Sequence, residues 1–443
     1  MEFDFEKFAG LIDESLIVDL AKRVIETPSP TGEEYDLAVL LKEVYGDLGL
    51  EAELQTLYSD GDVDRVNVAA RWRGNGTGPH VLFSGHLDTS VRGDEPWLTG
   101  DGWKNTPIVD DRIIWGNGIF NMKGAFVCYA AMMDAMRRAG VSFAGDVVIA
   151  GTCGEIELGS VDEFTGRRYD SQGVGLRYLL QHGYVADFHI LGEPTGLVPH
   201  VGHMGSTWAK ITTSGSFTHS AWADRSTSAI DEMWTLREKL NDWVADYRKN
   251  FVFQGVAPQV NFAAIRGGHP WRAARTANTC NMYVDIRFPP DVFPIDVQRD
   301  FTSRVTEIAA KHLRGDARVD WYMSRPGALV SPSSLVVERM VDAHNQAAGE
   351  ELGPVFGPPW CSDAIDSNRL GIPTVLYGLG RTRVDDSASP NASGDPRSAN
   401  GEYVCIDDMV TAAKAYGAAC AGLMNLDVAE VHRTRTPMPS VEL

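Results

Sequence analysis

The stretch HVLFSGHLDT, residues 80–89, joins a short apolar run to two polar side chains, His86 and Asp88. The length of the run is typical of a buried strand, and the polar pair comes where that strand would end. Similar apolar runs lie at 146–152, 188–193 and 372–378, and a helical segment lies at 122–140. Strands that alternate with helices predict an α/β fold with a mostly parallel sheet flanked by helices.

The pattern changes between residues 206 and 324. Alternating strand patterns at 206–217 and 279–289 are combined with long amphipathic helices at 229–250 and 297–313. We therefore expect two domains, a catalytic domain formed by 1–205 and 325–443, and an inserted α+β domain formed by 206–324.

Two helices are expected before the first strand. The first covers residues 14–26, and a T-x-x-E pattern at Thr31 and Glu34 predicts a capping box at the start of the second. The longest irregular stretch, 380–402, is rich in Ser, Asp, Asn, Pro and Gly, and loops of this length are usually functional or disordered.

The composition excludes several classes of partner. With 443 residues the chain is too long for one ordinary core, and its net charge of -20 repels nucleic acid and anionic lipid. The six cysteines form no C-x-x-C pair, which favours reduced thiols. The N-terminus lacks an apolar core and no window has 18 uninterrupted apolar residues, so we expect a cytoplasmic protein without a membrane span.

Acidic and imidazole side chains follow three of the predicted strands. His86 and Asp88 follow the first, Glu155 and Glu157 the second, and Glu193 the third. The carboxyl ends of parallel strands open on the ligand crevice. An H-x-D pair suits a metal site, since a carboxylate beside a ligating imidazole fixes its tautomer. By itself the pair is weak evidence, because an ordinary loop histidine gives the same pattern.

The order of the motifs strengthens this interpretation. They are SGHLDT (84–89), IIWGNGIFNMKG (113–124), GTCGEIELGS (151–160), LGEPTG (191–196), SGSFTHSA (214–221), VDIRFPP (284–290) and GIPTVLYGLG (371–380). This series resembles the metallopeptidase and amidohydrolase family that includes carboxypeptidase G, acetylornithine deacetylase, succinyl-diaminopimelate desuccinylase and aminoacylase. The resemblance covers nearly the whole chain, and it implies a zinc-peptidase-like catalytic domain, a two-metal site and a homodimer formed through the inserted lid domain.

The resemblance also implies roles for individual residues. His86 and Glu193 match metal ligands, Asp88 matches the residue that supports the histidine, and Glu155 matches the general base. The family's bridging aspartate is replaced by Asn121. The second residue of the family's acidic pair is replaced by Ile156. The histidine that the family has near the end of the chain has no counterpart here.

These departures favour a site for one metal. Two cations about 3.5 to 4 Å apart need an anionic bridge, whereas the neutral amide of Asn121 has one good acceptor oxygen. We expect one divalent transition metal ion per chain, Mn²⁺ or Zn²⁺, held by His86, Asn121 and Glu193. Alternatively, Glu157 supplies a ligand for a second ion if the strand end carries an extra residue.

The inserted domain and the long loop supply candidate substrate residues. His219 matches a family histidine that stabilises the oxyanion in the partner's active site, and Arg287 matches an arginine that binds a substrate carboxylate. A surface ion pair is the alternative for Arg287. Arg381 and Arg383, together with aromatics such as Trp222, suit a flat anionic substrate, although core packing also explains each aromatic.

The predicted function is hydrolysis of a C–N bond in a small molecule that bears a carboxylate. In one branch of the family, the enzyme displaces the amine of 5-nitroanthranilate with water. The altered site here resembles that branch in kind, because the aromatic ring accepts charge that a second metal would otherwise stabilise. This suggests hydrolytic deamination of an aromatic amine. The alternatives are an N-acyl amino acid amidohydrolase, a carboxypeptidase-type peptidase, and an inactive binding protein with the same fold.

Overall fold

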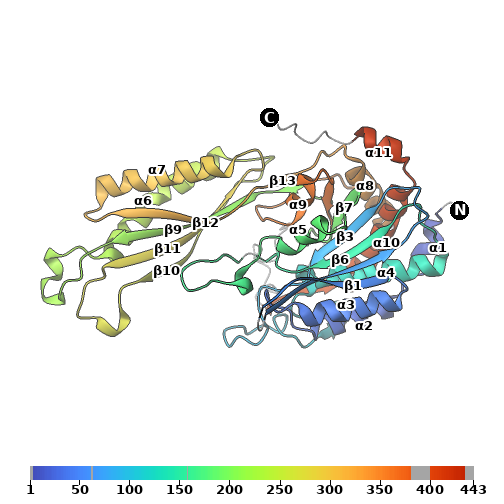
Figure 1. Cartoon of the computed structure of the whole chain (residues 1–443), viewed down its shortest axis with the longest axis horizontal. Coiled ribbons are helices and arrows are strands. Elements are labelled where there is room, and N and C mark those ends of the chain that lie inside the picture. Colours follow the sequence, from blue (N-terminus) through green and yellow to red (C-terminus); the bar gives the residue numbers. More distant parts are fainter. Residues whose placement is uncertain (1–2, 61–62, 157, 381–399, 435–443) are drawn as a thin grey trace. The chain divides into compact units, whose positions relative to one another are not determined.

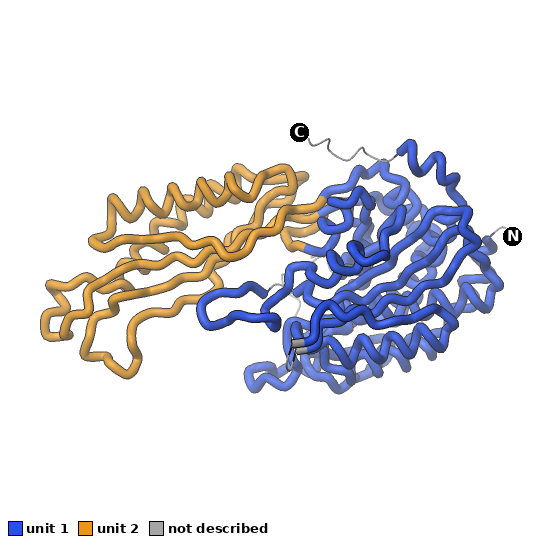
Figure 2. The backbone as a smooth tube through the Cα atoms, in the orientation of Figure 1, with its two compact units in different colours: residues 1–202, 329–355, 362–443 blue, residues 203–328, 356–361 orange. Residues whose placement is uncertain are grey.

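The computed structural model describes residues 3–60, 63–156, 158–380 and 400–434, and it divides into two compact units (Figures 1 and 2). Unit 1 comprises Met1–Gly202, Leu329–Val355 and Ser362–Leu443. Unit 2 comprises His203–Ala328 and Phe356–Cys361. The inserted domain expected at 206–324 thus lies inside unit 2, which begins slightly earlier, ends slightly later and gains a short segment from further along the chain.

Unit 1 is built on a six-stranded sheet in the order β1-β2-β6-β3-β7-β14. The strands are β1 (Glu51–Asp60), β2 (Val63–Trp72), β3 (Val81–His86), β6 (Val147–Thr152), β7 (Phe188–Leu191) and β14 (Thr374–Leu376). β3, β6, β7 and β14 pair in parallel, whereas β1 and β2 form an antiparallel extension. The mostly parallel sheet expected from the apolar runs is confirmed.

Helices cover both faces of this sheet (Figure 1). The helices of unit 1 are α1 (Phe5–Ala9), α2 (Glu14–Ile25), α3 (Tyr35–Asp47), α4 (Gly124–Ala139), α5 (Val174–Gln181), α8 (Leu335–Ala348), α9 (Ala364–Arg369), α10 (Ile406–Met424) and α11 (Val428–Thr434). Alternate residues of a strand point to opposite faces. Accordingly, Val81 and Phe83 join the core under α2, α3, α4 and α10, whereas Leu82 joins a separate core under α5.

The capping box expected before α3 is not formed. Glu34 is the residue before the helix, but it makes no side-chain capping bond. Its carboxylate instead accepts a hydrogen bond from the buried guanidinium of Arg65 at 2.9 Å. The Thr31 hydroxyl donates to Asp88 at 2.9 Å. The T-x-x-E prediction was wrong because both side chains are used in long-range polar contacts.

Shorter elements complete the chain. They are β4 (Ile108–Asp110), β5 (Ile113–Trp115) and β15 (Tyr403–Cys405), which form a small sheet, β8 (Gly202–His203), which pairs with β13 (Ala328–Leu329), and the turns of helix η1 (Ile119–Lys123), η2 (Arg167–Tyr169), η3 (Ser220–Arg225) and η4 (Pro270–Arg272). None of the described helices is both long and apolar enough to cross a lipid bilayer. No disulfide joins cysteines within the described residues.

Unit 2 is a four-stranded antiparallel sheet with two long helices on one face (Figure 2). The sheet order is β10-β11-β9-β12, with β9 (Gly205–Ser214), β10 (Val260–Gly267), β11 (Thr279–Phe288) and β12 (Ala317–Arg325), and the helices are α6 (Ala229–Asn250) and α7 (Pro294–His312). Ile211, Ile286 and Phe288 of the sheet join Leu236 and Phe301 of the helices in one core. The other face of the sheet carries the alternate residues.

Candidate metal centre

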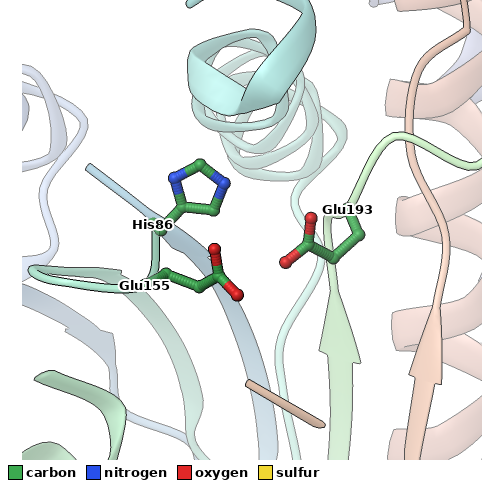
Figure 3. Close-up of side chains that lie close together, drawn as sticks. All are labelled: His86, Glu155 and Glu193. Carbon is green, nitrogen blue, oxygen red and sulfur yellow. The ribbon is translucent and has the colours of Figure 1, made fainter. Parts of the chain in front are cut away.

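Three polar side chains meet at the carboxyl ends of three neighbouring strands of unit 1 (Figure 3). His86 is the last residue of β3, which lies between β6 and β7 in the sheet. Glu155 follows β6 and Glu193 follows β7, so parallel pairing brings all three together. Their ligand atoms all lie within 4.8 Å of one another, and all three residues are buried. Three of the strand-end residues predicted from the sequence thus form one cluster.

The imidazole of His86 is fixed by hydrogen bonds on both sides. Its Nδ1 lies 2.8 Å from the backbone oxygen of Asp88, so Nδ1 carries a proton and donates it. Its Nε2 lies 2.9 Å from Oδ1 of Asn121. Burial disfavours the charged imidazole, but the carboxylates of Glu193 and Asp88 outweigh it and raise the pKa of His86 above its usual value.

This arrangement fits a divalent cation. When only Nδ1 is protonated, Nε2 and the amide oxygen of Asn121 both present lone pairs, so a divalent cation could take the place of the Nε2 proton that the raised pKa favours. Two buried carboxylates, each with an oxygen within 4.8 Å of a ring nitrogen of His86, add negative charge that a cation would offset. Nitrogen and oxygen ligands without a thiolate suit Mn²⁺ or Zn²⁺. His86, Glu155 and Glu193 could hold an ion, and Asn121 lies beside His86, where its oxygen could add a ligand.

Asp88 acts on the cluster in two ways. It orients His86 through its backbone oxygen, while its carboxylate Oδ1 lies 3.7 Å from Nδ1. That carboxylate instead accepts hydrogen bonds from the backbone N–H groups of Glu155 at 3.1 Å and Ile156 at 2.9 Å. The side chain of Asp88 therefore fixes the loop that carries Glu155, a role that the sequence did not indicate.

Asn121 lies in η1, where the chain turns into α4. Its φ of -124° and ψ of 93° are not helical. The Glu402 carboxylate accepts the N–H groups of both Phe120 and Asn121 at 3.1 Å. Glu402 is buried and positions this turn. The sequence did not indicate this role, because the contact joins residues 281 positions apart.

Lys123 connects the same turn to α2. The ammonium group is buried and donates to the backbone oxygens of Val24 at 3.0 Å and Thr27 at 2.8 Å. Burial lowers the pKa of Lys123 to about 7, and the nearby Glu402 carboxylate partly opposes this. The loop that presents Asn121 is thus anchored from two sides.

The remaining candidates belong to unit 2 or lie outside the described residues. His219 precedes η3 in unit 2, where its Nδ1 accepts the N–H of Ala221, and Trp222 beside it is 54% exposed. Arg287 of β11 donates from Nε to Asp285 at 2.8 Å. This is the ion pair considered as an alternative, although the Arg287 side chain is only 11% exposed. Arg381, Arg383 and Glu157 lie outside the described residues.

Comparison with known proteins agrees with this geometry. Residues 82–421 match the model of Peptidase family M20/M25/M40. The chain is 30% identical over 376 residues to the acetylornithine deacetylase of Photorhabdus laumondii, covering 82% of this chain and 89% of that one. It is 25% identical over 351 residues to the succinyl-diaminopimelate desuccinylase of Afipia carboxidovorans, covering 76% and 84%.

Solved structures share the fold as well. The di-peptidase Dug1p of Saccharomyces cerevisiae superposes with a TM-score of 0.75 at 13% identity, over 96% of this chain and all of that one. Human carnosine dipeptidase 1 gives a TM-score of 0.73 at 14% identity, over 95% and 99%. With the family match over most of the chain and a buried cluster of suitable ligands, this protein belongs to peptidase family M20/M25/M40, whose members are metal-dependent hydrolases.

Proposed function

We propose that this protein hydrolyses a C–N bond in a small carboxylate-bearing molecule with a single divalent ion held by His86, Asn121 and Glu193. The observation that carries the proposal is the buried cluster in which the Glu155 carboxylate lies within 4.8 Å of the ligand atoms of His86 and Glu193. The neutral amide of Asn121 beside His86 supports one ion over two, because it cannot bridge two cations.

The chain's own residues supply the proton transfers. A divalent ion bound there would make an attacking water molecule acidic near neutral pH. Glu155 accepts the proton of that water and returns it to the leaving nitrogen, as a general base and then a general acid. The hydrogen bonds from the Glu155 and Ile156 amides to Asp88 hold the base in place, so little reorganisation is needed during the reaction.

The specific proposal is displacement of an amine from an aromatic ring, as in 5-nitroanthranilate. Water adds to the ring carbon, the nitro group and ring take up the charge, and the amine leaves as ammonia with the proton from Glu155. A carbonyl substrate would place that charge on one oxygen, where a second cation contributes most. Arg287, Arg381, Arg383 and Trp222 are the proposed substrate-binding residues, since arginine binds carboxylates and aromatic side chains pack against rings.

The second candidate is hydrolysis of an N-acyl amino acid or a peptide. It is favoured by the matches to a deacetylase and a desuccinylase. Glu155 would play the same role, and the leaving group would be an amino acid. An inactive binding protein is the remaining possibility, and the buried base beside the ligand cluster argues against it.

Turnover assays on protein of known metal content separate these candidates. Purified protein is given 5-nitroanthranilate and, separately, N-acetylornithine, with Glu155→Gln as the control that should be inactive on both. Ammonia release from the first alone supports the specific proposal. Hydrolysis of the second alone replaces it with the amidohydrolase, and failure with both and with other N-acyl amino acids, while metal remains bound, leaves a binding protein.

We also propose a homodimer through unit 2. β10 is an edge strand of its sheet, and Ile265 on it is exposed. Ile230 and Trp234 of α6 are exposed too, Trp234 at 74%, and Ile230 lies beside the end of β10. A second copy would cover this apolar edge, and an open strand edge readily pairs.

Sedimentation measures the assembly directly. Trp234→Glu should convert the dimer to a monomer, because it places a charge in the interface. Trp97→Glu, at a tryptophan of unit 1 that is 68% exposed, is the matched control and should leave the dimer intact. A wild-type chain that sediments as a monomer at micromolar concentration would refute the proposal.

A further inference from the structure

Two polar side chains of β2 lie beside the segment that carries Glu155. β2 pairs antiparallel with β6, with Val68 opposite Gly151, so the first half of β2 lies beside the carboxyl end of β6. Arg65 and Asn67 belong to this half, and both are fully buried. Residues two positions apart on a strand point to the same face. Both side chains are therefore next to the chain where it leaves β6.

Asn67 joins the two ends of the segment between β6 and α5. Its Oδ1 accepts the N–H of Cys153 at 3.1 Å, and its Nδ2 donates to the backbone oxygen of Gly175 at 2.9 Å. The N–H of Gly175 donates to the backbone oxygen of Cys153 at 3.0 Å. A Cβ on Gly175 would lie only 2.7 Å from Oδ1 of Asn67, so the close approach requires glycine. The chain thus leaves β6 and enters α5 through one closed neck.

Arg65 lies between the start of this segment and the part that returns to α5. Its Nη1 donates to the backbone oxygens of Arg167 at 3.0 Å and Asp170 at 2.6 Å. Its Nη2 lies against Gly154, where a Cβ would collide with it. Gly154 also has a φ of +69°, which favours glycine. The guanidinium therefore packs against the residue before Glu155 and is bonded to the returning chain.

The returning chain has anchors of its own. The Tyr58 hydroxyl donates to the Asp170 carboxylate at 3.1 Å. The guanidinium of Arg167 lies over the Tyr58 ring, 4.2 Å from its centre. Arg65 thus connects Gly154 to a part of the chain that β1 already holds.

Glu34 supplies the counter-charge that lets Arg65 stay buried. Nη2 of Arg65 donates to Oε1 of Glu34 at 2.9 Å, and both side chains are fully buried. A buried guanidinium without a carboxylate would be strongly destabilising. The Asp88 carboxylate accepts the N–H of Glu155 itself. Glu155 therefore has one anchor on its own amide and a second, through Arg65, at the residue before it.

We propose that Arg65 and Asn67 are positioning residues for Glu155. They act through the backbone of Cys153 and Gly154 and keep the Glu155 carboxylate in place within the buried ligand cluster. A displacement of about 1 Å caused by a change away from the reacting atoms can lower a rate by about 10²-fold. The proposal rests on the proposed function, in which Glu155 is the general base.

Hydrogen–deuterium exchange of the full-length, metal-loaded protein measures this positioning. Arg65→Met should raise exchange at the amides of 153–156 by about tenfold or more, while the amides of β3 exchange as in the wild type. A general loss of stability would raise exchange in both, so a merely structural role would not give this difference. Arg73→Met, which breaks an exposed ion pair beyond the far end of β2, is the control and should change neither.

Two further variants serve if Arg65→Met does not fold. Arg65→Lys keeps the counter-charge for Glu34 but lacks the planar group that bonds two carbonyls, so exchange at 153–156 should still rise although the melting temperature falls less. Asn67→Leu removes the bonds at the neck and should raise exchange in the same stretch. Exchange at 153–156 that equals the wild type in both variants, or that rises equally in β3, overturns the proposal.

Turnover of the same variants measures the consequence for the reaction. In each, kcat should fall about 10- to 100-fold, with KM within about threefold of the wild type and the metal content unchanged. Wild-type kcat in spite of faster exchange also overturns the proposal. If the wild type turns over neither candidate substrate, the proposed function fails, whereas the exchange rates still decide whether Arg65 and Asn67 hold the chain at Glu155.

Discussion

Two histidines, both found from motifs, lie in opposite surroundings. His86 is buried at the end of a central strand. Its Nδ1 is hydrogen bonded to the backbone oxygen of Asp88, and its Nε2 lies next to the side-chain oxygen of Asn121. His219 lies in an exposed segment of unit 2, where it forms an isolated bridge with Arg275 and has the exposed Trp222 as its ring neighbour. Parallel strand pairing alone assembles the first site. The second histidine belongs to a segment of unit 2, and the role proposed for it in a partner's site depends on the proposed dimer.

The largest effect is expected from Glu155→Gln. If the buried cluster is catalytic, loss of the base should lower turnover by about 10² to 10⁴-fold, while the ligands His86 and Glu193 keep the metal. Steady-state rates and elemental analysis of the same preparation measure both. Turnover within tenfold of wild type would remove Glu155 from the mechanism, and loss of the metal would make it a ligand instead.

Loss of a buried ion pair should destabilise the protein more than loss of an exposed one. Arg65→Met leaves the buried Glu34 without its cation and should cost about 3 to 5 kcal/mol, whereas Arg318→Met breaks an exposed pair with Asp320 and should cost about 0 to 1 kcal/mol. Urea unfolding gives both values. Equal losses of unfolding free energy in the two variants would show that burial does not determine how much each ion pair stabilises the protein.

The cost of Arg65→Met should depend on pH. Burial raises the pKa of Glu34 to about 7, and Arg65 opposes this, so in the variant the pKa rises further. A folded-state pKa above the unfolded value means that the folded protein binds the extra proton, and its stability falls as pH rises from about 4.5 through that pKa. The variant should therefore lose more stability at pH 8 than at pH 5. The opposite trend would contradict the assignment to Glu34.

A smaller effect is expected at Asn121. Asn121→Asp adds negative charge beside the ion, makes it a weaker Lewis acid, and should lower activity near neutrality by about tenfold while the pH optimum moves upward. Wild-type protein should contain one metal per chain. A variant that binds a second metal and gains hydrolysis of N-acyl amino acids would instead indicate a degraded two-metal amidase. If the wild type needs two metals, Glu157 becomes the first replacement ligand to test.

The smallest effect concerns His219. Inactive Glu155→Gln and His219→Ala chains are mixed in equal amounts after verified subunit exchange. If His219 acts in the partner's site, half of the dimers are mixed and each has one intact site, so about a quarter of wild-type activity should return. No recovery of activity would mean that the active site of each chain is complete without the partner. His86 and His219 would then differ only in how exposed they are.

The sequence predicted the parts of this molecule that depend on local pattern. Apolar runs located β3, β6, β7 and β14, and their carboxyl ends located His86, Glu155 and Glu193. It did not predict contacts between distant segments. Such contacts depend on strand register and on the paths of loops, which the periodicity of a local sequence does not encode. They are the hydrogen bond from the Asn121 N–H to Glu402, the hydrogen bond from Thr31 to Asp88, and the alignment of Arg325 with Arg287 across β9.

The link between Glu402 and the Asn121 turn bears on how the protein is made. The two residues are 281 positions apart, and the whole of the segment from His203 to Ala328 lies between them. At about 5 to 20 residues per second, a ribosome finishes Glu402 roughly 15 to 60 seconds after Asn121. Once residue 193 has been added, the nascent chain has the strand ends that carry His86, Glu155 and Glu193, but until residue 402 is added its Asn121 turn lacks the carboxylate of Glu402. The order of synthesis therefore delays completion of the metal centre until the chain has returned to unit 1.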